Sequence, residues 1–204
     1  MIEELTIPGA FVFTPKQFGD DRGVFLEWFK SDVFVEAAGH SFDLSQANLS
    51  VSAAGVLRGI HFADVPPGQA KYITCPNGSV LDVVVDIRVG SPTFGQWDAV
   101  LLDDHDRKCI YLAEGLGHAF LSLEDGSTVA YLCSAGYNPG GEHGIHPLDP
   151  EIGIEWPKVG RNGEPLNYEL SAKDAEAPAL ADARESGLLP VYASVSSYIN
   201  SLNH

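Results

Sequence analysis

The sequence predicts an all-β fold of the jelly-roll type, a sandwich or barrel, with a helical tail at its C-terminus. Short runs rich in β-branched and aromatic residues follow one another through residues 1–160. Clusters of Gly, Pro, Asn and Asp, such as "CPNGS" and "YNPGGEHG", separate these runs at hairpin-like spacing. This regular succession is typical of jelly-roll folds. Further on, "SAKDAEAPALADARESGLLPVYASVSSYINSLNH" favours helix instead.

The elements follow in chain order. Strands are expected over residues 9–15, 23–29, 44–52, 56–62, 70–75, 79–89, 98–103, 108–113, 118–123 and 127–134. A helix is expected over residues 30–40, and Ser171 is a plausible N-cap in the tail, with Asp174 at the capping-box position. No linker or repeat interrupts the chain. We therefore expect a single domain over residues 1–204, with a barrel over about 1–160 and a helical tail over about 171–204.

Charge and composition narrow the class of protein. Twelve Lys and Arg against 28 Asp and Glu give a net charge of -16, which argues against nucleic acid and anionic membranes as partners. It leaves room for a small anionic ligand held by a local cluster of cations. No run approaches the roughly 18 to 20 apolar residues of a membrane span. The N-terminus carries acidic residues where a secretory signal would carry lysines, and the three widely spaced cysteines are expected to be buried free thiols. The sequence therefore predicts a cytoplasmic location.

Three basic side chains lie close together in "GVLRGIHFADVPPGQAKYITCPNGSV". Arg58, His61 and Lys71 occur there within strands that otherwise look buried. Strict alternation along a strand would place Arg58 and His61 on opposite faces. Gly59, between them, permits a β-bulge that would turn both toward one face. A shared site therefore depends on that bulge.

The spacing around these residues resembles the two motifs of cupins, which are small jelly-roll barrels. Five residues separate Gly55 from His61, six separate Lys71 from Gly78, and Gly115 and His118 form the second motif. Metal-binding cupins have a second His and a Glu where this chain has Ala63 and Lys71. Because an ammonium group repels a metal cation, we expect no metal here. His143 and His146 form another pair, but in a turn without a third ligand nearby.

The residue types suggest general acid–base chemistry with stabilisation of an oxyanion. His61 is suited to act as a general base, since imidazole titrates near neutral pH. Lys71 would stabilise an oxyanion, and Arg58 would hold a phosphate. Tyr131, in a strand that can lie across the pocket, is a candidate acid, although a half-buried core tyrosine is as good an interpretation. Asp82 and Asp86 alternate with apolar residues; Asp82 would orient His61 or Lys71, or form an ion pair with Arg58.

The chain resembles the dTDP-4-dehydrorhamnose 3,5-epimerases and the related 3-epimerases of deoxysugar and antibiotic biosynthesis. The resemblance runs over nearly the whole sequence. It is carried by "DDRGVFLEWF", "QANLSVSAAGVLRGIHF", "GQAKYITCPNGSVLDVVVDIRVGSPTFGQW", "YLAEGLGHAFLSLED", "YLCSAGYNPGGEHGI" and "LSAKDAEAP". It implies a cupin-type jelly-roll barrel, a homodimer, no cofactor, and a dTDP-4-keto-6-deoxyhexose as substrate.

The resemblance also implies roles for individual residues. The catalytic set would be His61 as base, Asp174 as its carboxylate partner, Lys71 beside the enolate and Tyr131 as the opposing acid. The substrate-binding set would comprise Gln46, Asn48, Arg58, His118, Tyr137 and Glu142. Arg22, Phe25 and Glu27 would reach the site from the partner subunit; taken alone, they suggest an edge strand with a solvated ion pair.

The expected reaction is inversion of C3, with or without C5, of the 4-keto sugar. The sequence alone does not decide whether one carbon or two carbons of the sugar are inverted. The resemblance slightly favours inversion at C3 alone. A 3,4-ketoisomerase on the same barrel and a non-catalytic sugar-nucleotide binding module are the alternatives. A metal-dependent cupin oxygenase is a third, against which Ala63 and Lys71 argue.

Overall fold

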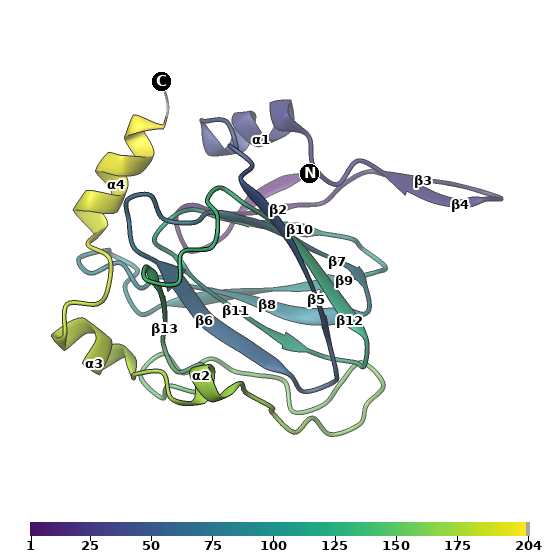
Figure 1. The fold of residues 1–204 in the computed structure, drawn as a ribbon. Coiled ribbons are helices and arrows are strands. Elements are labelled where there is room, and N and C mark those ends of the chain that lie inside the picture. The colour runs from purple at the N-terminus through teal and green to yellow at the C-terminus, as the bar shows by residue number, and fades with distance from the viewer. Residues whose placement is uncertain (203–204) are drawn as a thin grey trace.

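Two antiparallel sheets packed face to face form the body of the protein (Figure 1). The computed structural model describes residues 1–202. The first sheet has the order β1 (Ile2–Glu4), β2 (Ala10–Phe13), β10 (Cys109–Leu112), β7 (Lys71–Asn77), β12 (Ser127–Cys133) and β5 (Gln46–Ser52). The second has the order β13 (Glu142–Gly144), β6 (Leu57–Ala63), β11 (Gly117–Ser122), β8 (Ser79–Val85) and β9 (Trp97–Asp103). The jelly-roll prediction is confirmed.

Every expected strand is present, with small changes at its ends. The sequence analysis missed β1, β3 (Gln17–Asp20) and β13, which are short and lack an apolar alternation. The strand expected over 79–89 ends at Val85, and the turns that lead to the next strand lie at Gly90 and at residues 92–95. The Asp86 carboxylate binds the Arg88 guanidinium at 2.7 Å and the hydroxyls of Ser91 and Thr93 at 2.6 Å. The Asp86 carboxylate thus holds the segment between β8 and β9.

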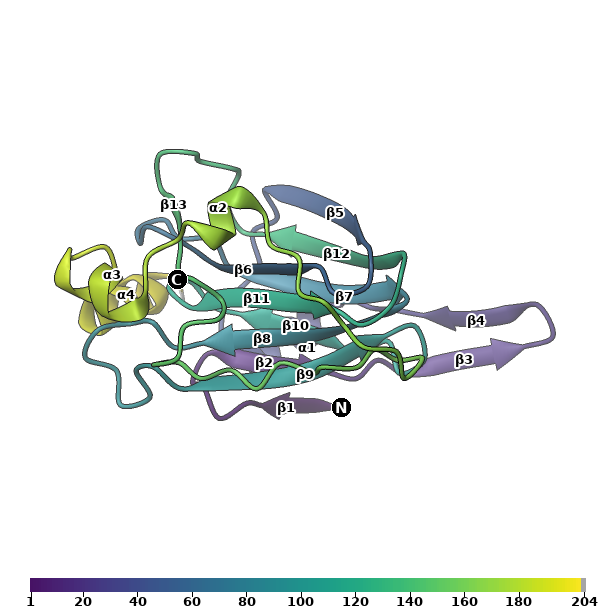
Figure 2. The same cartoon turned by 90° about the horizontal axis from the view of Figure 1, so that it is seen from below.

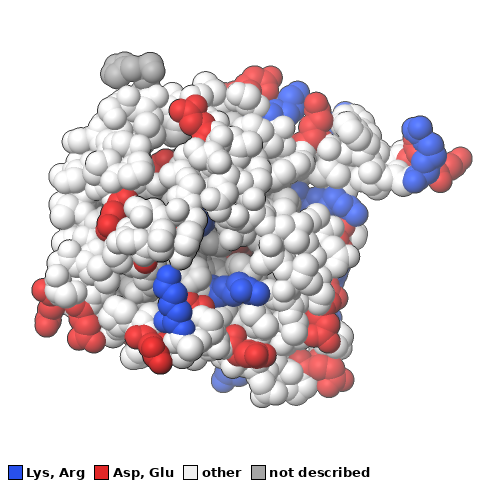
Figure 3. Space-filling view, viewed as in Figure 1, with Lys and Arg blue, Asp and Glu red and all other residues white. Residues whose placement is uncertain are grey.

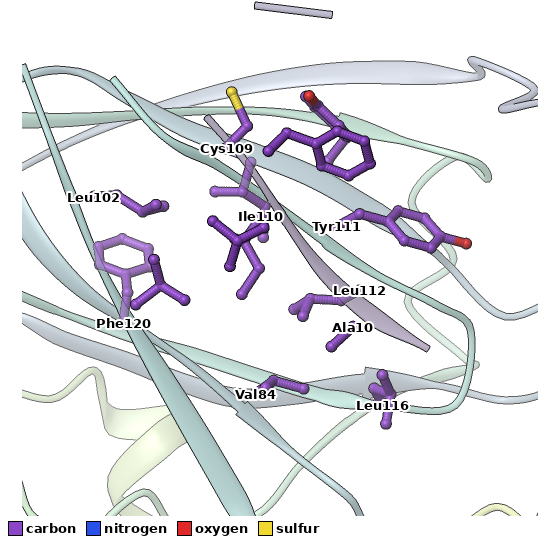
Figure 4. Packing of buried hydrophobic residues seen from close by; sticks show 14 of the residues in the cluster. Ala10, Val84, Leu102, Cys109, Ile110, Tyr111, Leu112, Leu116 and Phe120 are labelled. Carbon is purple, nitrogen blue, oxygen red and sulfur yellow. The ribbon is translucent and has the colours of Figure 1, made fainter. Parts of the chain in front are cut away.

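Alternation along β8 divides the apolar residues into two cores. Val80 and Val84 point between the sheets, whereas Val83 and Val85 point toward the C-terminal tail. Figure 4 shows the first of these cores, with Ile110 surrounded by side chains that include Leu102 and Phe120 of the opposite sheet. Together the two cores fix the second sheet on both faces, so its central strands hold their side chains in defined positions.

The helices lie outside the two sheets and pack against them. The helix expected over 30–40 is α1 (Ser31–Ala38), whose Phe34 is buried edge-on against Tyr111, with ring centroids 4.8 Å apart. The tail forms three short helices, α2 (Ala172–Ala175), α3 (Leu180–Glu185) and α4 (Tyr192–Ser201). Pro178 and Pro190 lie in the breaks between them, where a helix cannot continue. The predicted tail extends to residues 203 and 204, which lie outside the described residues.

The hairpin of β3 and β4 (Gly23–Leu26) projects from the body of the molecule (Figures 1 and 2). Within the described part of the chain its strands pair only with each other, and its apolar side chains Phe18, Val24 and Phe25 are about half or more exposed. Among the described residues, no helix has the length and apolar character needed to cross a membrane.

Candidate active site

A β-bulge in β6 brings Arg58 and His61 to the same face. Across to β11, His61 lies opposite His118 and Arg58 lies opposite Phe120, so β6 contains one extra residue between the two pairs. Gly59 occupies the bulge with a φ of +117°, and a Cβ there would lie 2.5 Å from the carbonyl oxygen of His118. The bulge on which the shared site depends is therefore present, and both side chains point toward the space between the sheets.

His61 forms a dyad with Asp174. The imidazole Nε2–H donates to Asp174 Oδ1 over 2.6 Å, while Nδ1 makes no hydrogen bond to a described residue. Ser171 caps α2 as expected, its hydroxyl accepting from the Asp174 N–H, and this turn aims the Asp174 carboxylate at β6. Burial alone would raise the pKa of Asp174, but hydrogen bonds from His61, Ser171 and the Gly59 backbone lower it. An ionised Asp174 leaves Nδ1 of His61 with its lone pair free.

Tyr131 and Lys71 face the dyad from the opposite sheet. Tyr131, on β12, is half-buried, and burial raises the pKa of its hydroxyl although the charge of Arg58 opposes that rise. Lys71 begins β7 and lies beside Cys133 of β12 in the strand register. Desolvation lowers the pKa of Lys71, while Cys133, Glu142 and Glu114 act against this effect. A phenol hydroxyl and an ammonium group therefore lie on the sheet opposite the His61–Asp174 dyad.

Several of the predicted substrate-binding residues are connected to one another near these strands. Asn48 lies opposite Tyr131 in the β5–β12 register, and its amide oxygen accepts from Gln46 over 2.8 Å. Gln46 in turn accepts the backbone N–H of Tyr137 at 2.9 Å. Glu142, on β13 next to β6, accepts from the backbone N–H of Asn138 at 3.3 Å. The loop between β12 and β13 is thus fastened over one end of the site.

His118 joins the site, but with a partner that the sequence analysis did not assign to it. Asp82 Oδ2 lies 2.9 Å from His118 Nε2, and Asp82 is completely buried. Both sequence-based roles of Asp82 were therefore wrong: it orients neither His61 nor Lys71, and it forms no ion pair with Arg58. Alternation along β8 did indicate that it faces the interior. Its partner lies on another strand, which only the β8–β11 register brings close.

The remaining predicted residues, Arg22, Phe25 and Glu27, do not reach this chain's own site. Arg22 is on the tip of the projecting hairpin, where it forms an exposed ion pair with Asp20. Phe25 is 66% exposed, and Glu27 lies 3.6 Å from Lys30. Within one chain these residues match what their local sequence suggests, an edge strand with a solvated ion pair. Their contribution to a partner's site stays a prediction.

The other histidine pair is placed outside the site. His143 Nε2 lies 2.8 Å from Asp64, and His146 Nδ1 accepts the backbone N–H of Leu148. Within residues 1–202, no group of three or more His, Cys, Asp or Glu side chains is placed to hold a metal ion. All three cysteines are free and buried, as expected.

A hollow of about 350 Å³ opens along β6. The side chains of Arg58, His61, Lys173 and Asp174 line it, together with residues of the segment that precedes α2. Figure 3 shows two basic side chains next to each other over β6, beside a hollow in this face, while acidic side chains are scattered over the rest. A second hollow of about 270 Å³ lies at the base of the hairpin and includes Glu27.

Sequence reasoning missed three residues that shape the site. Ser52 accepts a hydrogen bond from Arg58 Nε at 3.2 Å, and Cys133 lies beside Lys71 with its sulfur 3.6 Å from the Asn48 amide. Lys173 lines the hollow next to Asp174. The alternation of β5 and β12 could have pointed to Ser52 and Cys133, which share a face with Asn48 and Tyr131. Nothing in the local pattern indicates Lys173.

Comparison with known proteins identifies the family. The family model described as dTDP-4-dehydrorhamnose 3,5-epimerase matches residues 4–182. The chain belongs to this epimerase family. The dTDP-4-dehydrorhamnose 3,5-epimerase of Mycolicibacterium smegmatis is 59% identical over 98% of this chain and 95% of its own length. The dTDP-4-dehydrorhamnose 3-epimerase of Streptomyces niveus is 55% identical over 94% and 89%, respectively.

Solved structures agree with this membership. The rmlC epimerase of Mycobacterium tuberculosis superposes with a TM-score of 0.94 at 55% identity, covering 99% of both chains. ChmJ, a 3'-monoepimerase from Streptomyces bikiniensis solved in complex with dTDP-quinovose, has a TM-score of 0.93 at 46% identity, covering 98% of both. The predicted cupin-type jelly roll, the predicted family and the isomerase class of this epimerase are confirmed. Both 3,5- and 3-epimerases occur among these relatives, so identity does not choose between them.

Proposed function

We propose that this epimerase inverts C3 of a dTDP-4-keto-6-deoxyhexose by proton abstraction and reprotonation on opposite faces of the sugar. The observation that carries the proposal is the placement of a base and an acid on opposing sheets: His61 on β6, held by Asp174, and Tyr131 on β12. The relatives' names and the dTDP-sugar bound to ChmJ support the substrate class. Whether C5 is inverted as well is decided by the measurement below.

The first step removes the hydrogen next to the ketone. The C4 carbonyl acidifies the C3–H bond, and Nδ1 of His61 takes the proton, because Nε2–H is committed to Asp174. The electron pair of the C–H bond forms the C3–C4 double bond, and the carbonyl oxygen becomes an enolate oxygen. Lys71 stabilises that charge from the opposite sheet; a single preorganised donor of this kind contributes about 2.7–4 kcal/mol in other enzymes.

The second step returns a proton from the other face. The enolate electron pair re-forms the carbonyl as C3 takes the hydroxyl proton of Tyr131, which inverts the centre. The phenolate left behind regains its proton from solvent, and His61 releases its own. Since burial raises the pKa of Tyr131, the hydroxyl is protonated before each turnover at neutral pH. No redox partner is needed, because electrons and protons balance, and no cofactor enters this scheme.

The nucleotide end of the substrate would meet the basic residues at the rim. Arg58, held by Ser52, and Lys173 lie along the hollow beside His61. Gln46, Asn48, His118, Tyr137 and Glu142 would contact the sugar nucleotide in the same space. In this strongly acidic protein, such a cluster provides the local attraction that a diphosphate requires.

We further propose that the enzyme works as a homodimer in the cytoplasm, in which Arg22, Phe25 and Glu27 complete the partner's site. The projecting hairpin with its exposed apolar side chains supports this arrangement, as do the exposed Leu49 and Val51 on the outer face of the edge strand β5. The three buried free thiols fit a reducing compartment. Nucleic acid and membranes are not among the proposed partners.

The deciding experiment is proton NMR of dTDP-4-keto-6-deoxyglucose with enzyme in deuterated water, following C3–H and C5–H separately. Exchange and inversion at C3 alone would make the protein a 3-epimerase. Exchange at both carbons, with formation of the rhamno-configured product, would make it a 3,5-epimerase. The matched control is His61→Asn, which should lower turnover about 10³-fold or more while dTDP still binds. If wild-type enzyme binds dTDP but exchanges neither hydrogen, the proposal fails and a binding module becomes the better interpretation.

A further inference from the structure

A second His–carboxylate dyad lies next to the first one. His118 is directly opposite His61 in the β6–β11 register, and cross-strand neighbours on one face have Cβ atoms about 4.5–5.5 Å apart. Each histidine uses Nε2 to contact a carboxylate, Asp174 in one case and Asp82 in the other. In both, Nδ1 has no hydrogen bond to a described residue.

The two carboxylates have different surroundings. Asp174 also has the Ser171 hydroxyl and the Gly59 backbone beside it, and together with His61 these polar groups hold the pKa of Asp174 below its ordinary value. Asp82 is 0% exposed, and His118 is its only hydrogen-bond partner among residues 1–202, because Oδ1 has none. Burial raises the pKa of Asp82, and His118 opposes the rise. Only the first carboxylate is stabilised as an anion independently of its histidine.

The burial of Asp82 determines the number of protons on its dyad. A fully buried carboxylate with one hydrogen bond is strongly destabilised as a net charge, so the pair is net neutral. A neutral pair consists either of carboxylate and imidazolium or of carboxylic acid and imidazole. In the first form both ring nitrogens carry protons. In the second form the acid donates to Nε2 and the ring proton is on Nδ1. In both forms, Nδ1 of His118 is an N–H donor.

We propose that Asp82 is a positioning residue that keeps His118 a hydrogen-bond donor toward the C4 oxygen of the substrate, so that the two dyads have opposite roles. His61 presents a lone pair and takes the C3 proton. His118, a few ångströms away on the next strand, donates Nδ1–H to the oxygen on which the negative charge develops, together with Lys71. Because the pair carries no net charge, it is better suited to a polarised carbonyl than to a diphosphate. This inference rests on the proposed function.

The variants that test this role are His118→Asn and His118→Ala. An Asn side chain can place its amide N–H₂ near the position of the imidazole Nδ1, whereas Ala removes the donor. We expect His118→Ala to slow deuterium exchange at C3 about 10²–10³-fold, as for loss of one oxyanion donor, with dTDP affinity changed less than about threefold. His118→Asn should retain at least about tenfold more activity than Ala.

Asp82→Asn tests the positioning role by its pH dependence. Without the carboxylate, the neutral His118 proton is free to move to Nε2, and Nδ1–H returns when the ring is protonated. The ratio of variant to wild-type exchange rate should therefore rise as the pH falls, whereas a merely structural defect gives a constant ratio. Asp98→Asn is the control, because Asp98 lies on β9 and binds Thr6 away from the site.

Nitrogen-15 NMR of the wild-type histidines tests the inference even if these variants fail to fold. At neutral pH we expect Nδ1 of His118 to carry a proton and Nδ1 of His61 to lack one. The same protonation state of Nδ1 in both rings would overturn the inference. So would a His118→Asn variant that is as inactive as His118→Ala. A loss of dTDP affinity in His118→Ala that equals its loss of rate would overturn it as well. Wild-type enzyme without any C3 exchange would instead refute the proposed function, and the protonation states would still be measured.

Discussion

At the scale of single residues, Tyr131 is the group whose role is easiest to separate from that of the base. Proton abstraction needs only His61 and the stabilised enolate, whereas inversion needs a donor on the other face. We expect Tyr131→Phe to lose inversion by about 10²-fold or more and to keep deuterium exchange at C3. The same NMR experiment measures both. Unchanged inversion would mean that another group supplies the proton.

Lys71 gives the alkaline side of the pH–rate profile. Desolvation lowers the pKa of Lys71, whereas burial raises the pKa of Tyr131, so folding moves loss of the lysine proton to lower pH and loss of the tyrosine proton to higher pH. Only the ammonium form stabilises the enolate, so kcat should fall as the pH rises. The midpoint of this fall should lie below the ordinary lysine pKa of about 10.4. A guanidinium stays charged over this range, so in Lys71→Arg, whatever its absolute rate, the decline should move to higher pH. An identical alkaline limb in both proteins would assign it to another group.

At the scale of elements, the bulge in β6 sets the geometry of the site. Gly59→Ala would place a methyl group 2.5 Å from the His118 carbonyl oxygen and 2.6 Å from the Ala119 Cα. The strand would have to shift, which displaces both Arg58 and His61. We expect a loss of about 3 kcal/mol or more in the free energy of unfolding, measured by urea denaturation, and a large loss of kcat.

Gly90→Ala is the matched control for this prediction. Gly90 has a φ of +88°, but a Cβ there would meet nothing within 4 Å. It should therefore lose only the backbone term, about 1–2 kcal/mol, and retain its kcat. Equal losses in the two variants would show that backbone strain alone, and not the close approach to β11, makes Gly59 necessary.

The helical tail also positions a side chain of the candidate active site. The Ser171 cap and the single turn of α2 deliver Asp174 to His61 from 113 residues away in the chain. Leu180 and Ala183 of α3 anchor the tail by packing on the outer face of the second sheet. The helical tail thus acts as a structural support for the base, in addition to covering an apolar surface.

At the scale of the whole molecule, the proposed exchange of hairpins can be tested by mixing inactive proteins. One chain carries His61→Asn, and the other carries Arg22→Ala with Phe25→Ala on the hairpin. If hairpins serve the partner's barrel, a heterodimer contains one site with a wild-type barrel and a wild-type hairpin. Reassociated mixtures should regain up to about one quarter of wild-type activity.

The control for the mixing experiment combines both sets of changes in one chain. In a heterodimer with wild-type protein, this control chain forms no complete site. Mixed with the His61→Asn chain or with the hairpin variant, it should restore no activity. Sedimentation of the wild-type protein measures the dimer directly. A monomer, or a dimer whose mixtures stay inactive, would contradict the exchange while leaving the chemistry of His61 and Tyr131 unaffected.

Much of this protein was accessible from sequence because the signals are local. Alternating apolar residues and Gly-rich turns predicted most of the strands, and Gly59 marked a position that permits a bulge, since both depend on backbone preferences of neighbouring residues. The resemblance predicted the family. His61 is hydrogen-bonded to Asp174, and Lys71 and Tyr131 lie on the opposing sheet, while the roles of these four residues stay a prediction. The short strands β1, β3 and β13 escaped because nothing in their side chains distinguishes them from loops.

The tertiary structure alone decided which groups pair across strands. Asp82 was visible in sequence as an acid in an apolar strand, but its partner His118 lies 36 residues away and meets it only through the β8–β11 register. The different surroundings of Asp82 and Asp174 likewise depend on packing, because desolvation is a property of the folded interior and not of a residue's neighbours in the chain. The sequence by itself determined most of the strands, the family and the candidate reacting side chains; the fold determined which groups pair and how far each is removed from water.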